Sequence, residues 1–280
     1  MKKELLASSL IIILFLTGCS KNEVNTLDNI NENKEVVEDV NQHIEVASKI
    51  DSNKDWVYAA EYEKNIEAES YTTEFEETYY ASDIVVPYIN INSDDAKSAN
   101  EEIKMVFDDA IKIFNEGTND GLSYVDECNY ESYVDDNILS VLITYGTGAT
   151  SVVHPSYYAY NFDLKTGNKL TYQNVYQIAG FSTAEIESRV EEAITNKMKE
   201  MLADFSEDAL NDVISFYEPE NTSDISGFEF LKNRGVNEYK NSVNTNSLRY
   251  FLSTDGKLNI IVTLSIPADT GEFDTIITIE

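Results

Sequence analysis

The sequence is poor in cysteine, histidine and basic residues. Its 280 residues include two cysteines, two histidines and four prolines. Cys19 ends a leader motif described below, so Cys128 has no internal disulfide partner, and this excludes a disulfide framework. No histidine and cysteine cluster has the spacing of a zinc site, and there is no glycine-rich phosphate loop or EF-hand loop. We therefore expect no cofactor and no bound metal.

Acidic residues strongly outnumber basic ones. The chain has 51 Asp and Glu residues against 20 Lys and Arg, which gives a formal net charge of −31. Such a field repels nucleic acid and attracts cationic partners, so nucleic acid is not an expected partner. The simpler interpretation is that the charge only keeps the protein soluble. Hydrophobic residues make up 42% of the chain, enough for a sizeable core in one or two domains.

The N-terminus has the features of an export signal. Two lysines precede a short apolar run that ends at Leu16, and the sequence Leu-Thr-Gly-Cys follows over residues 16–19. This motif resembles the bacterial lipobox, which implies cleavage after residue 18 and diacylglycerol on the thiol of Cys19. We expect residues 1–18 to be a lipoprotein signal peptide. The protein would then be held by its lipid at the outer face of the bacterial cytoplasmic membrane. The alternative is an ordinary signal peptide with a chance cysteine.

Residues 19–55 are predicted to be a flexible linker. This stretch is rich in Asn, Asp, Glu and Lys and has no aromatic residue before Trp56. Such a composition cannot bury enough apolar surface to fold alone, so we interpret it as a disordered, lipid-anchored spacer. His43 lies in this solvated stretch, and we assign it no ligand role.

Two principal helices are predicted in the folded part. The first begins after Ser93, a good N-cap, carries apolar residues at helical spacing, and is closed by Gly117. The second covers residues 183–205, and a shorter helix follows over residues 207–216.

The remaining segments alternate or are apolar, which is typical of strands. We expect strands over residues 57–69, 71–80, 84–89, 122–134, 138–145, 156–164, 248–253, 258–266 and 275–279. Hairpin turns join several of them, at residues 165–168 for example. The pattern indicates an α+β fold with mainly antiparallel sheets and the two principal helices packed on them, after the disordered tether.

Several segments together resemble a known family. They are Asp-Asn-Ile-Leu-Ser-Val at residues 136–141, Tyr-Asn-Phe-Asp-Leu-Lys-Thr-Gly-Asn-Lys-Leu-Thr at 160–171, and Phe-Leu-Ser-Thr-Asp-Gly-Lys-Leu at 251–258. They resemble the extracellular domain of RsiV-type anti-sigma factors, which is also found in PdaC-type peptidoglycan deacetylases. Residues 86–89 and the helix after them resemble the companion domain that precedes it. The resemblance implies an N-terminal part over residues 56–135 and an RsiV-like α+β domain over residues 136–280.

The resemblance also implies a partner and marks a departure. Some members bind lysozyme, a strongly cationic protein, which fits the acidic charge of this chain. Members often carry a Gly-Gly-Ala-His loop after the central strand, whereas residues 146–155 here place His154 further along. No membrane-spanning, sigma-binding segment precedes the domain and no deacetylase domain follows it, so neither of those activities is expected.

The candidate ligand-binding residues are His154, Tyr157, Tyr158 and Tyr160. His154 is the one histidine of the folded part, and the three tyrosines follow it closely. Tyrosines bury much area at interfaces and keep a polar tip. The alternatives are that His154 is an ordinary loop residue and that the tyrosines are ordinary strand residues on alternating faces. We assign no catalytic residue.

These observations favour a non-enzymatic binding or sensing module on the cell surface. Its partner would be a cationic protein such as lysozyme, or a cell-wall component such as peptidoglycan, besides the membrane reached through Cys19. One alternative is a hydrolase of envelope polymers that uses carboxylates, with His154 as a further candidate. Another is a passive structural lipoprotein.

Overall fold

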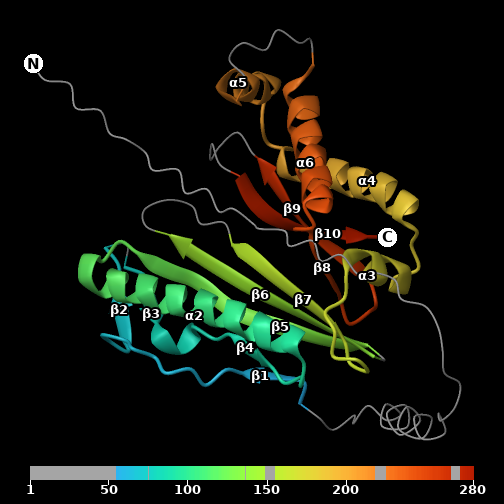
Figure 1. The fold of residues 1–280 in the computed structure, drawn as a ribbon. Coiled ribbons are helices and arrows are strands. Elements are labelled where there is room, and N and C mark those ends of the chain that lie inside the picture. Colours follow the sequence, from blue (N-terminus) through green and yellow to red (C-terminus); the bar gives the residue numbers. More distant parts are fainter. Residues whose placement is uncertain (1–54, 75, 136, 149–154, 218–224, 266–271) are drawn as a thin grey trace, which may run out of the picture. The chain divides into compact units, whose positions relative to one another are not determined.

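The computed structural model describes residues 55–280, apart from residues 75, 136, 149–154, 218–224 and 266–271 (Figure 1). The predicted signal peptide, Cys19, the predicted linker up to residue 54, and His154 lie outside the described residues. The described part has an α+β fold of small antiparallel sheets with helices packed on them, as the sequence predicts.

The longest helix, α2 (Asp94–Asp120), begins where the sequence predicts. The Ser93 hydroxyl accepts a hydrogen bond from the backbone N–H of Ala96, which caps the first turn. The prediction that Gly117 closes the helix is wrong. Gly117 lies inside α2, and the helix ends at Gly121, whose φ of 66° is the left-handed conformation that glycine adopts without strain.

The segment before α2 contains short strands only. β1 pairs with β4, and β2 pairs with β3, both antiparallel. The bounds of the strands are β1 Val57–Ala59, β2 Ser70–Thr72, β3 Thr78–Tyr80 and β4 Pro87–Ile89. A single 3₁₀ turn, η2 (Ala81–Asp83), lies between β3 and β4. The long strands predicted over residues 57–69 and 71–80 are therefore wrong in extent. Residues after Ala59 instead make individual contacts, such as the Tyr62 ring packed against Phe107 of α2.

A three-stranded antiparallel sheet in the order β5-β6-β7 lies against α2 (Figure 1). Its strands are β5 (Tyr124–Asp135), β6 (Ile138–Gly148) and β7 (Ser156–Asp163). Because side chains alternate along a strand, the sheet has two different faces. One face forms a core with α2, and Leu139, Val141, Ile143 and Phe162 are buried there. The expected subdivision after residue 135 falls between β5 and β6, two paired strands of this sheet.

The second half of the chain folds around another antiparallel sheet, in the order β10-β9-β8. Its elements are α3 (Tyr172–Ile178), α4 (Thr183–Met201), α5 (Glu207–Tyr217), α6 (Gly227–Asn244), β8 (Arg249–Leu252), β9 (Leu258–Ser265) and β10 (Glu272–Ile279). Helices α4 and α6 contact this sheet and share a core with it. The sequence predicts two principal helices, but the described part of the chain also contains α6, a third long helix.

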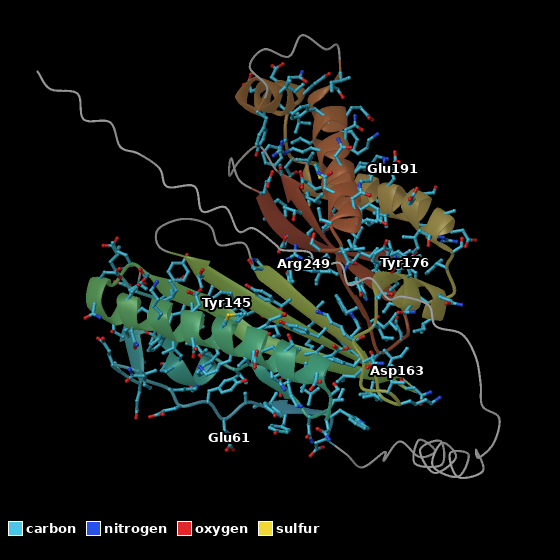
Figure 2. The ribbon with its side chains drawn as sticks, viewed as in Figure 1. Glu61, Tyr145, Asp163, Tyr176, Glu191 and Arg249 are labelled. Atoms are coloured by element: carbon cyan, nitrogen blue, oxygen red, sulfur yellow. The ribbon has the colours of Figure 1, made fainter. Side chains whose placement is uncertain are left out.

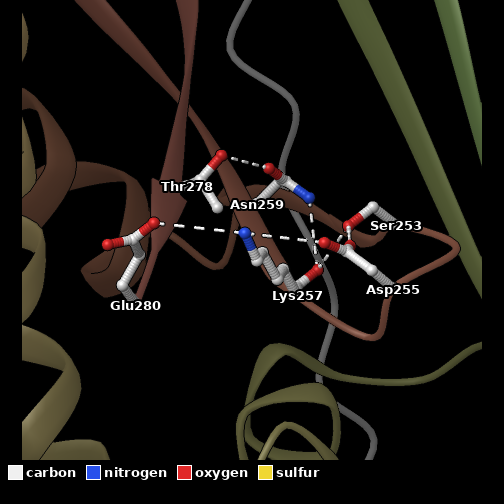
Figure 3. Close-up of polar contacts among 6 residues, drawn as sticks. All are labelled: Ser253, Asp255, Lys257, Asn259, Thr278 and Glu280. Atoms are coloured by element: carbon white, nitrogen blue, oxygen red, sulfur yellow. Dashed lines mark hydrogen bonds and ion pairs between the residues drawn. The ribbon is translucent and has the colours of Figure 1, made fainter.

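The β8–β9 turn is tied to β10 by polar contacts (Figure 3). Ser253 Oγ donates to Asp255 at 2.6 Å, and Gly256 takes the positive φ of 74° that the turn requires. The Thr278 hydroxyl of β10 donates to Asn259 at 2.8 Å. The hydrogen bond from Ser253 is the main cause of the lowered pKa of the Asp255 carboxyl. These contacts hold the turn between β8 and β9.

Buried polar side chains join the two three-stranded sheets. Ser140 donates to Asn161 at 2.7 Å, and the Asn161 amide donates to the carbonyl oxygen of Tyr250 at 2.6 Å. The Ser140 oxygen in turn accepts the backbone N–H of Leu252 at 3.1 Å. Beside these bonds lies a small apolar cluster that includes Phe251 of β8. The free backbone edge of β8 is thus satisfied by two side chains of the other sheet.

Candidate functional site

The three candidate tyrosines lie on both faces of β7. Tyr158 and Tyr160 belong to the face that packs with α2, whereas Tyr157 contacts the cluster between the two sheets. This is the period-two alternation of a strand. The three rings therefore do not form one cluster, and the structure brings together only Tyr158 and Tyr160. His154 lies outside the described residues.

Tyr158 and Tyr160 line a groove along the free edge of β7, with a volume of about 380 Å³. We call it the β7-edge groove. The chain after β7 forms one end of it, and the segment leading into β8 forms the opposite wall. Its lining comprises Glu102 and residues 158–161, 169–171 and 246–250. The sequence predicts the two tyrosines but none of the other residues of this groove.

The hairpin turn after β7 forms one end of the groove. Gly167, with a φ of 74°, lets the chain reverse, and its N–H donates to the carbonyl of Asp163 at 2.7 Å. The returning chain then pairs with the end of β7, where the Leu170 N–H donates to the carbonyl of Asn161 at 2.8 Å. The Tyr250 hydroxyl donates to the carbonyl of Leu170 at 2.7 Å. This end of the groove is therefore fixed from both sides.

Charged groups surround the Tyr160 ring. Lys169 Nζ lies 5.5 Å from the centre of the ring, within the range of a cation–π interaction. Burial, and then the neighbouring Glu102 carboxylate, raise the pKa of the Tyr160 hydroxyl. Burial and Asp109 likewise raise the pKa of Tyr158. Both hydroxyls therefore stay protonated at neutral pH and can donate hydrogen bonds.

Arg249 of β8 holds the other wall of the groove (Figure 2). Its guanidinium donates to both carboxylate oxygens of Asp274, one of them at 2.7 Å, and to the carbonyl of Tyr157 at 3.0 Å. Asp274 also accepts a hydrogen bond from Thr263. Since its charge is balanced by Asp274, Arg249 links the two sheets and adds little positive potential to the groove.

Two carboxylates of α2 lie beside the tyrosines of the sheet. Asp109 accepts a hydrogen bond of 2.6 Å from the hydroxyl of Tyr145 on β6. Glu102 is seven residues earlier, two turns along α2, and so lies on the same side of the helix. On the side next to α2 the groove therefore holds one carboxylate, Glu102, and the Lys169 ammonium over the Tyr160 ring.

The excess of acid is concentrated in one part of the sequence. Residues 55–164, which we call the acid-rich half, contain 23 Asp and Glu residues, four lysines and no arginine. Three of the lysines pair with carboxylates on α2 itself, namely Lys97 with Asp94, Lys104 with Asp108 and Lys112 with Glu116. Lys64 donates to the backbone carbonyls of Ala81 and Ile84. Among the described residues, most carboxylates of this half therefore have none of its own lysines beside them.

Cys128 is buried, with 2% of its surface exposed. Burial, more than the neighbouring Glu127, raises the pKa of its thiol to about 12. A protonated thiol is a poor nucleophile. Cys128 is therefore a buried structural residue of β5.

The carboxyl groups with resolved pKa shifts are displaced downward. Asp94, Asp120, Glu185 and Asp255 have lowered pKa values, and in each the largest cause is a hydrogen bond to the carboxylate. A general acid in glycoside hydrolysis needs a raised pKa instead. No shift resolved in this structure therefore favours the hydrolase alternative.

The described part of the chain offers neither a metal site nor a membrane-spanning helix. Within it, no three His, Cys, Asp or Glu side chains are grouped so that they could hold a metal ion. Among the same residues, none of the helices combines the length and the apolar character needed to cross a membrane.

Comparison with known proteins adds no further constraint. Neither a protein-family model nor a curated protein matches the chain. The resemblance to RsiV-type extracellular domains stays a prediction, and the function proposed below rests on the charges and the groove of this molecule.

Proposed function

We propose that this chain is a non-enzymatic binding module of a surface lipoprotein, anchored through Cys19, and that it captures a cationic protein or a cationic cell-wall component. The observation that carries the proposal is the charge of the acid-rich half, where 23 acidic residues face four lysines. Because those lysines are engaged within the same half, its excess negative charge favours a cationic partner.

The β7-edge groove supports the proposal by offering a place for specific contacts. Uniform acidity steers a cationic partner but does not select it. Specific interfaces depend on a few anchoring side chains, among which tyrosine is frequent. Tyr158 and Tyr160 lie in the groove next to the acidic side of α2. Steering by the acid-rich half and anchoring in the groove would then act together.

Binding of the full chain to lysozyme tests the proposal directly. We expect a complex that forms fast at low salt and survives at about 0.15 M salt, where charges more than about 8 Å apart are largely screened. Surface-immobilised full chain in detergent and lysozyme at graded salt provide the measurement. A complex found only at low salt would be nonspecific attraction, and no complex at all would contradict the capture of this cationic protein.

Charge-neutralising variants locate the attraction. Glu102→Gln with Asp109→Asn removes two charges from α2 beside the groove. Glu187→Gln with Glu191→Gln removes two exposed charges from α4, outside the acid-rich half, and serves as the matched control. We expect the first pair to slow lysozyme association by about threefold or more and the second pair to change it little, since steering depends on where the charge lies. If both pairs slow association equally, lysozyme does not bind beside the groove.

A further inference from the structure

In the described chain, strand β10 is an outer edge of its sheet, and its backbone is open on that side. The carbonyl of Tyr250 and the N–H of Leu252 bind side chains of the other sheet, so these two residues of β8 point away from β9. Backbone direction alternates in an antiparallel ladder, and the register from β8 through β9 to β10 is unbroken. The residues of β10 that point outward are therefore Asp274, Ile276 and Thr278. Within the described chain, none of their N–H and C=O groups has a hydrogen-bond partner.

This edge lacks several features that usually protect an exposed strand. Protected edges are short, bulged, interrupted by proline or covered by another element. Strand β10 has eight residues in continuous register, without proline or glycine, and its centre is the β-branched run Thr-Ile-Ile-Thr at residues 275–278. The two acids before this run are each paired with an arginine of the same chain, Glu272 with Arg234 and Asp274 with Arg249. The edge is therefore suited to pairing with another strand.

Helix α4 forms a wall along this edge and limits what can pair there. A groove of about 450 Å³ lies between α4 and β10. Its wall on α4 consists of Arg189, Glu192, Ala193, Asn196, Lys197 and Glu200. Two of these residues are basic and two are acidic, so the wall is balanced in a chain whose net charge is −31. Such a wall gives no advantage to a partner with a strong charge of either sign.

The order of the charges along α4 is self-complementary. The pairs Arg189 with Glu200 and Glu192 with Lys197 share one midpoint, between residues 194 and 195. If two α4 helices run antiparallel about this midpoint, every charge of one wall faces an opposite charge of the other wall. The two uncharged residues of the wall, at positions 193 and 196, have the same midpoint and face each other as well. This charge complementarity identifies a second copy of the chain as the occupant.

One two-fold axis satisfies the strand and the helix together. An axis perpendicular to the sheet reverses the direction of both β10 and α4, so each meets its own copy in antiparallel orientation. We propose that this chain forms a symmetric dimer in which β10 pairs with β10 and α4 lies against α4. The two three-stranded sheets then continue as one. This surface belongs neither to the acid-rich half nor to the β7-edge groove, so the dimer does not depend on the proposed function.

A charge reversal on α4 tests the helix contact. Sedimentation equilibrium of the full chain in density-matched detergent, at about 0.15 M salt, measures self-association. We expect Glu200→Arg to weaken the dimer about tenfold, because it sets like charges opposite each other twice in a symmetric dimer. The substitution lowers the net negative charge, so general repulsion between the copies cannot explain a loss. Glu191→Arg makes the same change on α4 outside the groove and should not weaken the dimer.

The double variant Arg189→Glu with Glu200→Arg is the sharper test. It exchanges the two charges, so opposite charges face each other again and the dimer should return to wild-type strength. Residues 189 and 200 lie about 16 Å apart along one helix, too far to interact within one chain. The contact of Lys197 with Glu200 at 3.2 Å does lie within one chain, but exchanging the charges does not restore it. Recovery therefore requires the second copy.

Two substitutions of Thr278 test the strand contact. Thr278→Pro removes an outward N–H without breaking the β9–β10 ladder, because proline is tolerated at edge positions. Thr278→Ala is the matched control, since both variants lose the hydroxyl that donates to Asn259 (Figure 3) but only proline loses the N–H. We expect the proline variant to weaken the dimer about tenfold and the alanine variant to weaken it less than about threefold. Circular dichroism checks that both variants fold.

The controls decide the outcome. A wild-type chain that is monomeric at every concentration measured would overturn the proposal. Equal effects of Glu200→Arg and Glu191→Arg, or of the two substitutions of Thr278, would also overturn it. Association through the lipid anchor or through residues 1–54 would leave all these variants alike and therefore counts against the proposal. Loss with Glu200→Arg and Thr278→Pro, with recovery in the double variant, supports it.

Discussion

At the scale of single residues, Ser140 and Asn161 connect the two halves of the fold. Their exposed fractions are 1% and 3%, and each makes hydrogen bonds across the junction of the sheets. A buried polar group is costly unless it is paired, so this pair specifies one way of joining the sheets. It also fixes β8, whose preceding residues form a wall of the β7-edge groove.

We expect Asn161→Ala to lower the free energy of unfolding by about 1–3 kcal/mol, because it leaves the Ser140 hydroxyl and the Tyr250 carbonyl without their partner. Urea unfolding of the full chain measures this change. The exposed hydroxyl pair of Thr72 and Thr78 is the control, since Thr72→Ala should change stability by less than about 0.5 kcal/mol. Similar losses of stability in the two variants would show that the buried hydrogen bonds contribute no more than an exposed one.

At the scale of secondary-structure elements, α2 packs very closely against Tyr71 and against Ser123, which follows the helix. A Cβ atom added to Gly117 would lie 2.1 Å from the carbonyl oxygen of Ser123 and 2.4 Å from the Tyr71 ring. Glycine is therefore required here by close packing and not by the end of the helix. The Tyr71 hydroxyl donates to that same carbonyl at 2.7 Å, so neither neighbour is free to move away.

Gly117→Ala separates packing from helix propensity. Propensity alone would stabilise a helix interior by about 1 kcal/mol. The overlap with backbone should outweigh this gain, and we expect a net destabilisation of about 1–3 kcal/mol. Ser98→Ala, on the exposed face of α2, is the matched control and should have a small or stabilising effect. A Gly117→Ala variant that is more stable than the wild type in urea would contradict the packing argument.

The elements that the sequence predicts are those whose apolar residues recur with a clear helical or strand period. The starts of α2 and α4 and the strands from β5 to β10 follow from apolar periodicity and from caps such as Ser182, although α4 ends at Met201 and not at residue 205. Helix α6 escapes prediction because glycine, which disfavours helices in isolation, stands at its first position, Gly227, and again inside it, at Gly235. Gly235 is tolerated there because it brings α6 close to Leu264 of β9.

The groove is less predictable than the elements around it. Alternation along β7 places Tyr158 and Tyr160 on one face, and this follows from the sequence alone. The opposite wall comes from residues 246–250, about 90 positions farther along the chain, through contacts such as that of Arg249 with Tyr157. No local pattern specifies a contact at that separation.

At the scale of the whole molecule, the net charge and the buried hydroxyl and thiol groups both lower the stability of the fold as pH rises. The chain has a net charge of −31 at neutral pH, so each further ionisation adds to self-repulsion. Several groups that ionise only at high pH are held in their neutral form by burial. The pKa of Cys128 is raised from 9.0 to about 12, and those of Tyr71 and Tyr133 from 10.0 to about 12. Burial is the largest cause in all three.

We therefore expect stability to fall as pH rises from about 9 to 12. These groups have higher pKa values folded than unfolded, so in this window the folded state retains protons that the unfolded state has lost. Their contribution is complete below the unfolded pKa and disappears as pH passes the folded pKa. Urea midpoints measured across this range, together with tyrosinate absorbance, test the sign. Cys128→Ala removes the group that titrates first, so its midpoint should fall less between pH 9 and 10 than that of the wild type. A midpoint independent of pH up to 12 would show that these hydroxyls and the thiol are not protected by the fold.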